Sequence, residues 1–369
     1  MSASIAFQEK SSARFAMGGF GRLMRILVIG FGVVGRSFTE LLATHQGDLY
    51  RDHGLAPRLV GVVDSGGAAV SERGLDLRAL LETKANQGTV AATGGHGVTN
   101  LDTQSLIADS DADVVIEATP SRMDAPETAM GHIRAAFRNG KHVITVNKAP
   151  LALAMPPLTE LARYNRVQFR FSGTVGGGTP MLNWARECAR GDQVVRLRGI
   201  LNGTTNFILS KMHETGARFD EVLDEAVRLG YAETDPSADI DGVDAATKVV
   251  ILANLILNRR VTLKDVQIEG IRGLSTARVK QAADKGESLK LIAEIGDTLS
   301  VSPQTVPRGD PLDVPANLNA LTMTLRNSGD VTLVGRGAGG VETATAVLRD
   351  LLDIWSFVAS PDGVDKPFM

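Results

Sequence analysis

Short apolar runs and longer segments of helical spacing alternate over the first 150 residues. Four runs have the length of a β-strand and are apolar almost throughout: residues 25–30, 58–64, 113–119 and 142–146. Such runs are typical of strands buried on both faces of a parallel sheet. Segments between them, most clearly 126–139, carry apolar side chains at helical spacing. This alternation predicts an α/β domain at 24–150, built on a doubly wound parallel sheet.

The pattern changes after residue 150. Helical spacing is found at 157–164, 219–229 and 245–257, and strand patterns at 167–171, 194–201, 321–326 and 331–334. Residues 261–273 and 289–302 mix strand and loop features, and 303–319 is polar and predicted to be a loop. We therefore expect a smaller α+β domain at 151–329, with residues 330–369 completing the first domain. Residues 1–23 lack the apolar core of a secretion signal and are predicted to be a disordered N-terminal extension.

The strand at 25–30 leads directly into the sequence GFGVVG. Gly30, Gly32 and Gly35 have the spacing of a dinucleotide-binding loop between a strand and a helix. The first glycine permits a tight turn, the second lets a pyrophosphate approach the backbone, and the third allows close packing of helix and strand. The free N–H groups of the helix start favour the anion. We predict a Rossmann-type domain that binds a dinucleotide through Gly30, Phe31, Gly32, Val33, Val34 and Gly35.

The carboxyl ends of the other strands supply further candidates. Asp64 ends the second strand, where a carboxylate usually binds the adenosine ribose and repels a 2′-phosphate. Ser65 and the glycines after it could admit a phosphate instead, so the choice between NAD and NADP stays open. Thr119 and Pro120 follow the third strand and Lys148 follows the fourth, at the sheet edge where open α/β proteins bind ligands.

Acidic residues are concentrated at 230–248, in GYAETDPSADIDGVDAATK. Asp244 and Lys248 are four residues apart, so they share one face of a helix. A solvated ion pair is the usual explanation of such a pair. Because the next nine residues are mostly apolar, this helix is expected to be buried, which favours a functional pair. We predict that Asp241 or Asp244 caps the helix, and that Asp235 and Asp241 serve turns or caps.

Three further glycine-containing segments precede helices. SGTVGGGTP at 172–180 exposes backbone groups that could hold an ion or a reactant. NGTTNFIL at 202–209 offers the N–H groups of Gly203 and Thr204 to a substrate carboxylate. GRGAGG at 335–340 lacks dinucleotide-loop spacing, and we expect it to bring the chain back over the nucleotide domain.

Composition and charge narrow the function classes. The 369 residues suffice for two domains, and a net charge of −3 gives no electrostatic reason to expect nucleic acid or an anionic membrane as partner. No apolar run reaches the roughly 18 residues that span a bilayer. The six histidines show no metal-binding spacing. The single cysteine, Cys188, cannot form an internal disulfide, which fits a soluble protein of the reducing cytoplasm.

Taken together, the chain resembles homoserine dehydrogenase in its short form, without a fused aspartate kinase or ACT domain. GILNGTTNFIL at 199–209 and the acidic stretch at 230–248 carry most of the resemblance. The segments EATP, VITVNKAP, GTVGGGTP and GRGAGGVETA follow the order of the family, and the likeness extends from Arg25 to about Ile354.

The resemblance implies reversible NAD(P)-dependent hydride transfer between L-homoserine and L-aspartate 4-semialdehyde, in threonine, methionine and isoleucine biosynthesis, by a homodimer. It implies catalytic roles for Lys148, Asp244 and Lys248. Substrate contacts would come from Glu233, Asp239, Gly203, Thr204 and Tyr231, and cofactor contacts from Thr119, Pro120, Lys148 and Gly339. It also implies a monovalent cation, Na⁺ or K⁺, on the backbone of Val175, Gly177 and Thr179. The chain departs from the family at Ser172, where many relatives have a glutamate side chain for that cation.

Proton transfer sets a further expectation. Aldehyde reduction leaves an alkoxide that needs a proton, and a lysine serves best when its pKa falls towards the working pH. Two converging ammonium groups would lower it, with Asp244 orienting Lys248. The competing hypotheses are another amino-acid or semialdehyde dehydrogenase and a non-catalytic nucleotide-binding sensor.

Overall fold

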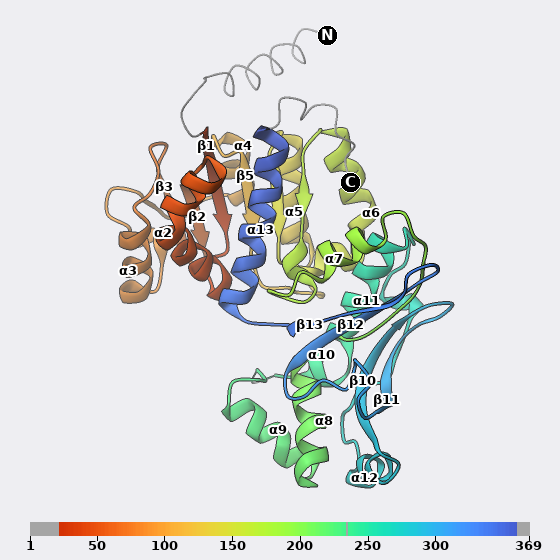
Figure 1. Ribbon diagram of the computed structural model, residues 1–369. Helices are drawn as coiled ribbons and strands as arrows, with labels where there is room; N and C mark the ends of the chain where they lie inside the picture. The colour runs from red at the N-terminus through yellow and green to blue at the C-terminus, as the bar shows by residue number, and fades with distance from the viewer. Residues whose placement is uncertain (1–21, 234, 360–369) are drawn as a thin grey trace.

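The structure is a computed structural model that describes residues 22–233 and 235–359, and it contains two sheets (Figure 1). A seven-stranded sheet has the order β4-β3-β2-β1-β5-β6-β7, and a six-stranded sheet the order β13-β12-β8-β10-β11-β9. The seven-stranded sheet and its helices form the upper part of Figure 1, and the six-stranded sheet lies below. None of the described helices is long and apolar enough to cross a membrane.

The first sheet confirms the doubly wound α/β prediction. Its parallel strands are β1 (Arg22–Ile29), β2 (Leu55–Asp64), β5 (Val114–Glu117), β6 (His142–Thr145) and β7 (Phe169–Arg170). An antiparallel edge was not predicted, and it consists of β3 (Gly67–Val70) and β4 (Gly97–Val98). These strands are too short to leave a clear period in the sequence. β1 starts at Arg22, so the last two residues of the predicted extension belong to a strand, and residues 1–21 lie outside the described part.

Helices cover both faces of this sheet: α2 (Val33–His53), α3 (Leu77–Gln87), α4 (Thr103–Asp109), α5 (Glu127–Arg138), α6 (Lys148–Tyr164), α13 (Gly340–Ala359) and the short η1 (Val90–Ala92). Alternate residues of β1 join different cores. Ile26 and Val28 pack in one core with α2 and α13, and Leu27 and Ile29 in another with α5 and α6. The expected division at residue 150 falls inside α6, and the sheet continues through β7. The late helix α13 packs against α2 and β6.

The second sheet contains β8 (Val194–Ile200), β9 (Val266–Ile268), β10 (Glu287–Ile295), β11 (Leu299–Pro307), β12 (Leu318–Leu325) and β13 (Gly329–Arg336). Its helices are α8 (Gly203–Thr215), α9 (Phe219–Arg228), α10 (Ser237–Ile240), α11 (Val243–Ile256) and α12 (Thr276–Asp284), with the short η3 (Leu263–Asp265). The short η2 (Ser172–Thr174) packs against α13 and against α7 (Met181–Cys188), which lies beside the first part of the molecule. Helix α12 was not predicted. The predicted loop at 303–319 is wrong at its start, because β11 continues to Pro307 despite two prolines.

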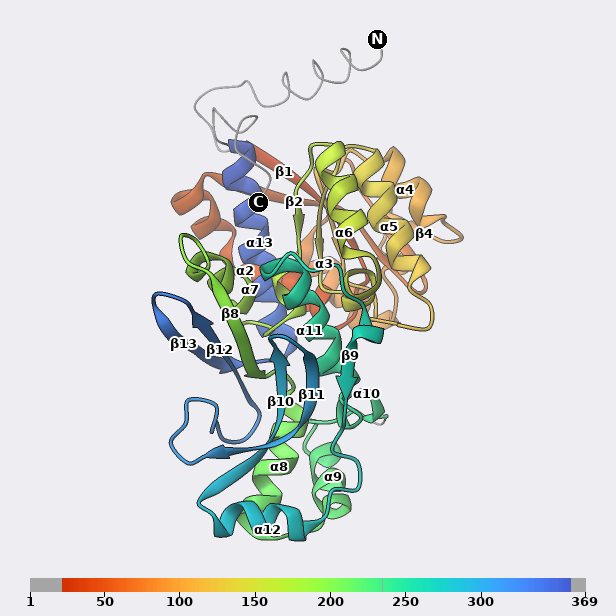
Figure 2. The same cartoon turned by 90° about the vertical axis from the view of Figure 1, so that its right-hand side faces the viewer.

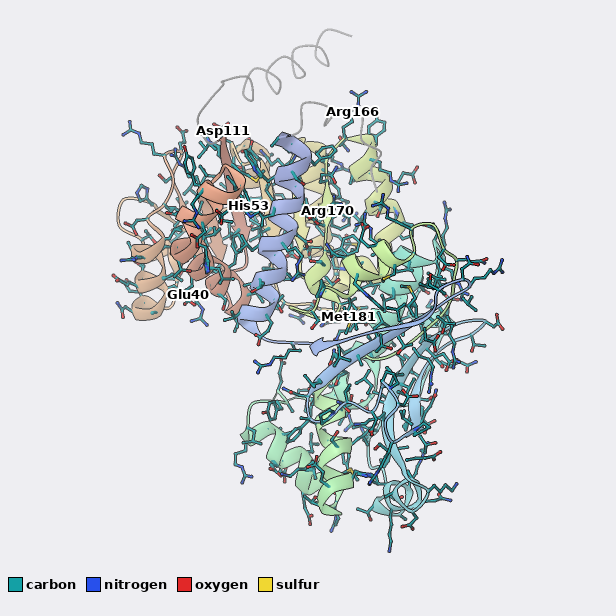
Figure 3. All side chains as sticks on the ribbon, in the orientation of Figure 1. Glu40, His53, Asp111, Arg166, Arg170 and Met181 are labelled. Atoms are coloured by element: carbon teal, nitrogen blue, oxygen red, sulfur yellow. The ribbon has the colours of Figure 1, made fainter. Side chains whose placement is uncertain are left out.

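Helix α11 connects the two parts of the molecule. It is buried from Ala245 to Asn254 and packs against α6 of the upper part and β10 of the lower part (Figure 2). Met181, at the start of α7, lies at the same junction (Figure 3). The predicted acidic cap of α11 is wrong. Its N-cap is Gly242, with a left-handed φ of 82°, while the Asp241 carboxylate binds Arg272 at 2.6 Å.

Candidate active site

One buried carboxylate lies between two lysines. The Asp244 carboxylate is 2.8 Å from the Lys148 ammonium through Oδ1 and 2.7 Å from the Lys248 ammonium through Oδ2. Lys248 comes from the same helix turn, whereas Lys148 comes from the start of α6 in the other part of the molecule. Lys248 also donates to the Leu201 carbonyl at 2.6 Å. The Lys148 side chain is 30% exposed and that of Lys248 9%, so Lys148 is the more accessible ammonium.

Asn202 links this centre to the predicted substrate acids. Its Nδ2 donates to Asp239 at 2.7 Å and to Asp244 at 2.9 Å. Its Oδ1 accepts from the Thr205 N–H and so caps α8. Asn202 was absent from the predicted site residues. The available signal was its position before a helix, because asparagine is a preferred N-cap residue.

The other predicted substrate residues surround the start of α8. The Thr204 hydroxyl lies 2.9 Å from the Asp239 carboxylate and 2.8 Å from the Tyr231 carbonyl, so the two acceptors share its single proton. The Tyr231 ring packs against Phe207, with centroids 4.7 Å apart. Gly203 begins α8, where a Cβ would come within 2.8 Å of the Asn317 carbonyl oxygen. Glu233 is exposed. No described residue accepts a hydrogen bond from the backbone N–H of Gly203 or Thr204.

The electrostatics differ from the sequence-based expectation. Burial alone would raise the pKa of Asp244, but the two ammonium groups hold it far below its ordinary value. The Asp244 carboxylate raises the pKa of Lys148 against the opposing effect of burial. Asp239 and Glu233 raise the pKa of Lys148 further. The expectation that the surroundings lower the pKa is therefore wrong for Lys148, because the nearby carboxylates outweigh the effect of burial.

A buried carboxylate organises the strand ends beside Lys148. Glu117 is fully buried and accepts hydrogen bonds from the hydroxyls of Thr119 and Thr145. The Asn147 side chain donates to the carbonyls of Thr119 and Pro120 at 3.3 and 3.1 Å. Asn147 also caps α6, whose first residue is Lys148. The predicted cofactor residue Thr119 and the predicted catalytic Lys148 are thus held in one network, in which the sequence had not identified Glu117 or Asn147 as site residues.

The glycine loop has the form that a dinucleotide needs. Gly30 has a φ of 99°, and a Cβ there would come within 2.5 Å of the Ala118 carbonyl oxygen. A Cβ at Gly35 would overlap the Gly30 carbonyl, whereas one at Gly32 would meet nothing within 4 Å. The space beside Gly32 is therefore open to a ligand. The side chain of Phe31 is buried in the core, so Phe31 can offer only its backbone, and Val33 is exposed while Val34 is partly buried.

The late GRGAGG segment packs beside this loop. A Cβ at Gly340 would come within 2.5 Å of Val33, the first residue of α2. A Cβ at Gly177 would come within 2.8 Å of the Gly337 carbonyl oxygen, so the segments at 172–180 and 335–340 also contact each other. Gly339 has a φ of 141°. The two glycine-rich segments and the dinucleotide loop therefore form one surface.

The carboxylate of Asp64, which the sequence predicts to bind the ribose, is bonded by its own part of the chain. Its carboxylate accepts from Lys84 at 2.6 Å, from the N–H groups of Val90 and Gly66 at 2.8 Å, and from the Thr89 hydroxyl at 2.9 Å. Its side chain is 4% exposed. Burial opposes ionisation, but these hydrogen bonds lower the pKa of Asp64. Because its lone pairs are taken by the chain itself, Asp64 fixes the turn after β2 and presents no free carboxylate to a ribose.

The segment at 172–180 leaves some carbonyls available. Among the described residues, none donates a hydrogen bond to the carbonyl oxygen of Val175 or Gly177, and the Thr179 carbonyl accepts from the Met181 N–H at 2.7 Å. The Ser172 N–H donates to Asp350 of α13 at 2.8 Å. Burial raises the pKa of Asp350 to about 7. The carboxylate near Ser172 is therefore engaged with the backbone.

Relatives and solved structures cover almost the whole chain. A homoserine dehydrogenase of Methanocaldococcus jannaschii is 41% identical over 90% of this chain and 99% of its own. An NAD(+)-dependent homoserine dehydrogenase of Pseudomonas canavaninivorans is 37% identical, over 89% of this chain and 96% of its own. The structure of a hyperthermophilic archaeal homoserine dehydrogenase in complex with NADPH aligns with a TM-score of 0.79 at 31% identity, over 90% of this chain and 97% of that one.

A dinucleotide-binding sheet joined to a domain with a lysine–carboxylate centre defines an NAD(P)-dependent oxidoreductase. The homoserine dehydrogenase model matches residues 180–352, and the homoserine dehydrogenase NAD binding domain model matches residues 30–172. The chain belongs to the homoserine dehydrogenase family. Its activity is the NAD(P)-dependent interconversion of L-homoserine and L-aspartate 4-semialdehyde, a reaction of amino-acid biosynthesis. The alternatives of another dehydrogenase or a nucleotide sensor are not favoured.

Proposed function

We propose that Lys148, Asp244 and Lys248 carry out the proton transfer of homoserine dehydrogenation. The observation that supports this most directly is the Asp244 carboxylate between two ammonium groups, at 2.8 and 2.7 Å. Bound NAD(P)H supplies the hydride in aldehyde reduction. One ammonium then donates a proton to the new alkoxide, and the other stabilises the negative charge while it develops. Asp244 stays ionised and holds both nitrogen atoms in position.

We propose that the acidic residues bind the substrate ammonium. Asp239 lies beside Asn202, and Glu233 acts on the same centre through its charge. The free N–H groups of Gly203 and Thr204 suit the substrate carboxylate, because a helix start favours an anion. Tyr231 and Thr204 would border the same site. These contacts place the reacting carbon of a four-carbon amino acid near the lysines.

Substrate binding would then change the proton affinity of Lys148. In the free enzyme, Asp239 and Glu233 raise the pKa of Lys148. A bound substrate ammonium offsets part of that effect, because its one positive charge opposes the charges of the two acids. Lys148 would thus release its proton more readily when homoserine is present, which is the state in which alcohol oxidation needs a base.

We infer that the dinucleotide binds along the surface of Gly30, Gly32 and Gly35, with Gly339 on one side and Thr119 and Pro120 on the other. The open space at Gly32 and the contact of Gly340 with Val33 support this path. Lys148 follows the next strand end and would border the nicotinamide. Since Asp64 offers no free carboxylate, we propose that NAD and NADP are both accepted.

A monovalent cation and a homodimer are also proposed. The free carbonyls of Val175 and Gly177, with that of Thr179, suit Na⁺ or K⁺, although the Ser172 side chain adds no charge. The proposal is tested by measuring the Tm while the concentration of either ion is raised. The homodimer is proposed from the resemblance to the family alone, and light scattering would test it. With one cysteine, the protein suits the reducing cytoplasm.

The residue assignments are tested by measuring homoserine oxidation at alkaline pH, with NAD⁺ and NADP⁺ in parallel. The absorbance of the reduced nicotinamide reports the rate. We expect turnover by the wild type, and a loss of about 10²–10⁴ in kcat when Lys148 or Lys248 is replaced by methionine. The matched control is Lys84→Met, which removes an ion-paired lysine away from the acidic site. Equal kcat values for Lys248→Met and Lys84→Met would contradict the assignment.

A further inference from the structure

Asn319, the second residue of β12, has a buried side chain without partners. The residue is 1% exposed, and among the described residues neither its Nδ2 nor its Oδ1 has a hydrogen-bond partner. Buried amide groups are nearly always hydrogen-bonded, so an unpaired one calls for an explanation. Turning the Asn319 amide by about 180° would not provide a partner, because neither its nitrogen nor its oxygen position has one.

The position of Asn319 connects the parts of the site. Its amide lies against Gly337, where any Cβ would overlap it. Three residues later Gly340 contacts Val33 of the dinucleotide loop. On the other side, Ala320 pairs with Ile200, so the next step of the ladder places Asn319 beside Leu201, whose carbonyl accepts from Lys248. Asn319 therefore lies between the dinucleotide loop and the lysine–carboxylate centre.

This is the region that the nicotinamide half of the cofactor must occupy. The proposed function places the pyrophosphate at the glycine loop and the reacting carbon at the lysines. The nicotinamide ribose and ring must span the distance between them. A group that lies between these two points and lacks partners is placed to contact the ring substituent.

The chemistry of the amide selects the ligand group. An asparagine side chain offers an N–H donor and a carbonyl acceptor, and both are unpaired here. A substrate carboxylate could satisfy only the donor. The carboxamide of nicotinamide offers a carbonyl and an NH₂ group, so two amides can form two hydrogen bonds. We propose, building on the proposed function, that Asn319 binds the nicotinamide carboxamide and fixes the orientation of the ring.

The segment 337–339 controls access to this amide. Ala338 and Gly339 are exposed, and Gly337 lies directly on the Asn319 side chain. Because the Asn319 side chain is almost fully buried, the proposal requires this segment to shift when the ligand binds. Glycine at 337 and 339 makes such a shift possible, because glycine tolerates backbone angles that other residues do not.

The test compares binding of a complete and a truncated cofactor. The wild type, Asn319→Ala and the control Asn327→Ala, whose side chain bonds Asp192 in the turn after β12, are titrated with NADH and with ADP-ribose, which lacks nicotinamide. We expect Asn319→Ala to weaken NADH binding about tenfold, the effect of one or two lost hydrogen bonds, and to leave ADP-ribose binding within about twofold. Asn327→Ala should alter neither.

A measurement on the wild type keeps the test valid if Asn319→Ala fails to fold. The 3-acetylpyridine analogue of NAD⁺ replaces the amide NH₂ with a methyl group, so the wild type should bind it several-fold more weakly than NAD⁺. Equal wild-type affinity for both, or equal weakening of NADH and ADP-ribose by Asn319→Ala, would overturn the proposal. Homoserine turnover by the wild type is recorded separately, so failure of the proposed function would be seen independently.

Discussion

Two aspartates of this chain have similar positions in the sequence but different surroundings in the structure. Asp64 is the last residue of a strand and Asp244 lies in the first turn of a helix, and both were predicted to face a ligand. Asp64 and Asp244 are both nearly buried, and both bind lysine within 2.8 Å. The Asp64 carboxylate is surrounded by four donors of its own part of the chain. The Asp244 carboxylate binds two lysines, one of which is 30% exposed.

The difference shows what separates a structural ion pair from a reactive one. At Asp64, one cation and three uncharged donors use the carboxylate completely, so the pair closes a turn. At Asp244, two lysines share one carboxylate, which leaves ammonium protons that can meet a ligand. The number of opposite charges and the exposure of one partner, rather than the presence of the pair, indicate function.

The largest predicted effect comes from removing the charge of Asp244. Asp244→Asn would remove the carboxylate charge that lies between the two ammonium groups, so kcat for homoserine should fall by about 10²–10⁴. Asp64→Asn is the matched change and should leave kcat within about threefold, while reducing stability through the Lys84 that it strands. Steady-state kinetics checks both. A kcat loss as large in Asp64→Asn as in Asp244→Asn would remove the distinction.

The pH dependence of the Asp244 centre should respond to Glu233. Alcohol oxidation needs a deprotonated lysine, and the pKa of Lys148 is raised in the free enzyme, so kcat/KM for homoserine should increase with pH into the alkaline range. Glu233→Gln removes one of the charges that raise the pKa of Lys148. The rising limb of the profile should therefore move to lower pH. Asp220→Asn, on an exposed helix end, is the control and should not shift it.

The Asp64 centre should affect folding more than turnover. Lys84→Gln removes the cation from a buried carboxylate that keeps three other hydrogen bonds, so we expect a loss of about 1–3 kcal/mol in the free energy of unfolding. The ratio of kcat/KM for NADP⁺ to that for NAD⁺ should also fall, because the unpaired Asp64 charge repels a 2′-phosphate. Urea denaturation and cofactor kinetics measure these effects. An unchanged ratio would show that Asp64 has no influence at the adenosine end.

A further predicted effect concerns Asp350, a buried acid whose carboxylate accepts the Ser172 N–H. Burial raises its pKa in the folded chain to about 7 from an ordinary 3.8, so the folded state retains a proton that the unfolded state has lost. This contribution to stability is complete below about pH 4 and is lost progressively as the pH rises to about 7, by at most a few kcal/mol at ~1.4 kcal/mol per pKa unit. Asp350→Asn should flatten that part of the profile of Tm against pH. An identical slope in both proteins would contradict it.

Much of the fold could be predicted because its signals are local. The apolar runs of β1, β5 and β6 are buried on both faces, and the glycine spacing at 30–35 lies between a strand and a helix, as predicted. The short edge strands β3 and β4 and helix α12 were missed, since a few residues do not establish a period. The acidic cap of α11 was predicted wrongly, because Arg272 binds Asp241 and the two lysines bind Asp244.

The candidate site could be predicted only in part, because several of its contacts leave no local signal in the sequence. Asn202 was recognisable as a residue before a helix, yet its bonds to Asp239 and Asp244 depend on α10 and α11 packing beside it. Glu117 looked like one more residue of a buried strand. Its network with Thr119 and Thr145 exists only because two parallel strands end at the same level.

The sequence by itself determined the dinucleotide loop and the pairing of Asp244 with Lys248, because both follow from fixed spacings along one strand–turn–helix or one helix. The tertiary structure alone decided that Lys148 joins that pair from the start of α6 and that Lys84 binds the carboxylate of Asp64. It also decided the direction in which the pKa of Lys148 moves. The pKa of a side chain and its hydrogen-bond partners depend on which charged and polar groups lie near it. Groups that are distant in the sequence become neighbours only when the chain has folded.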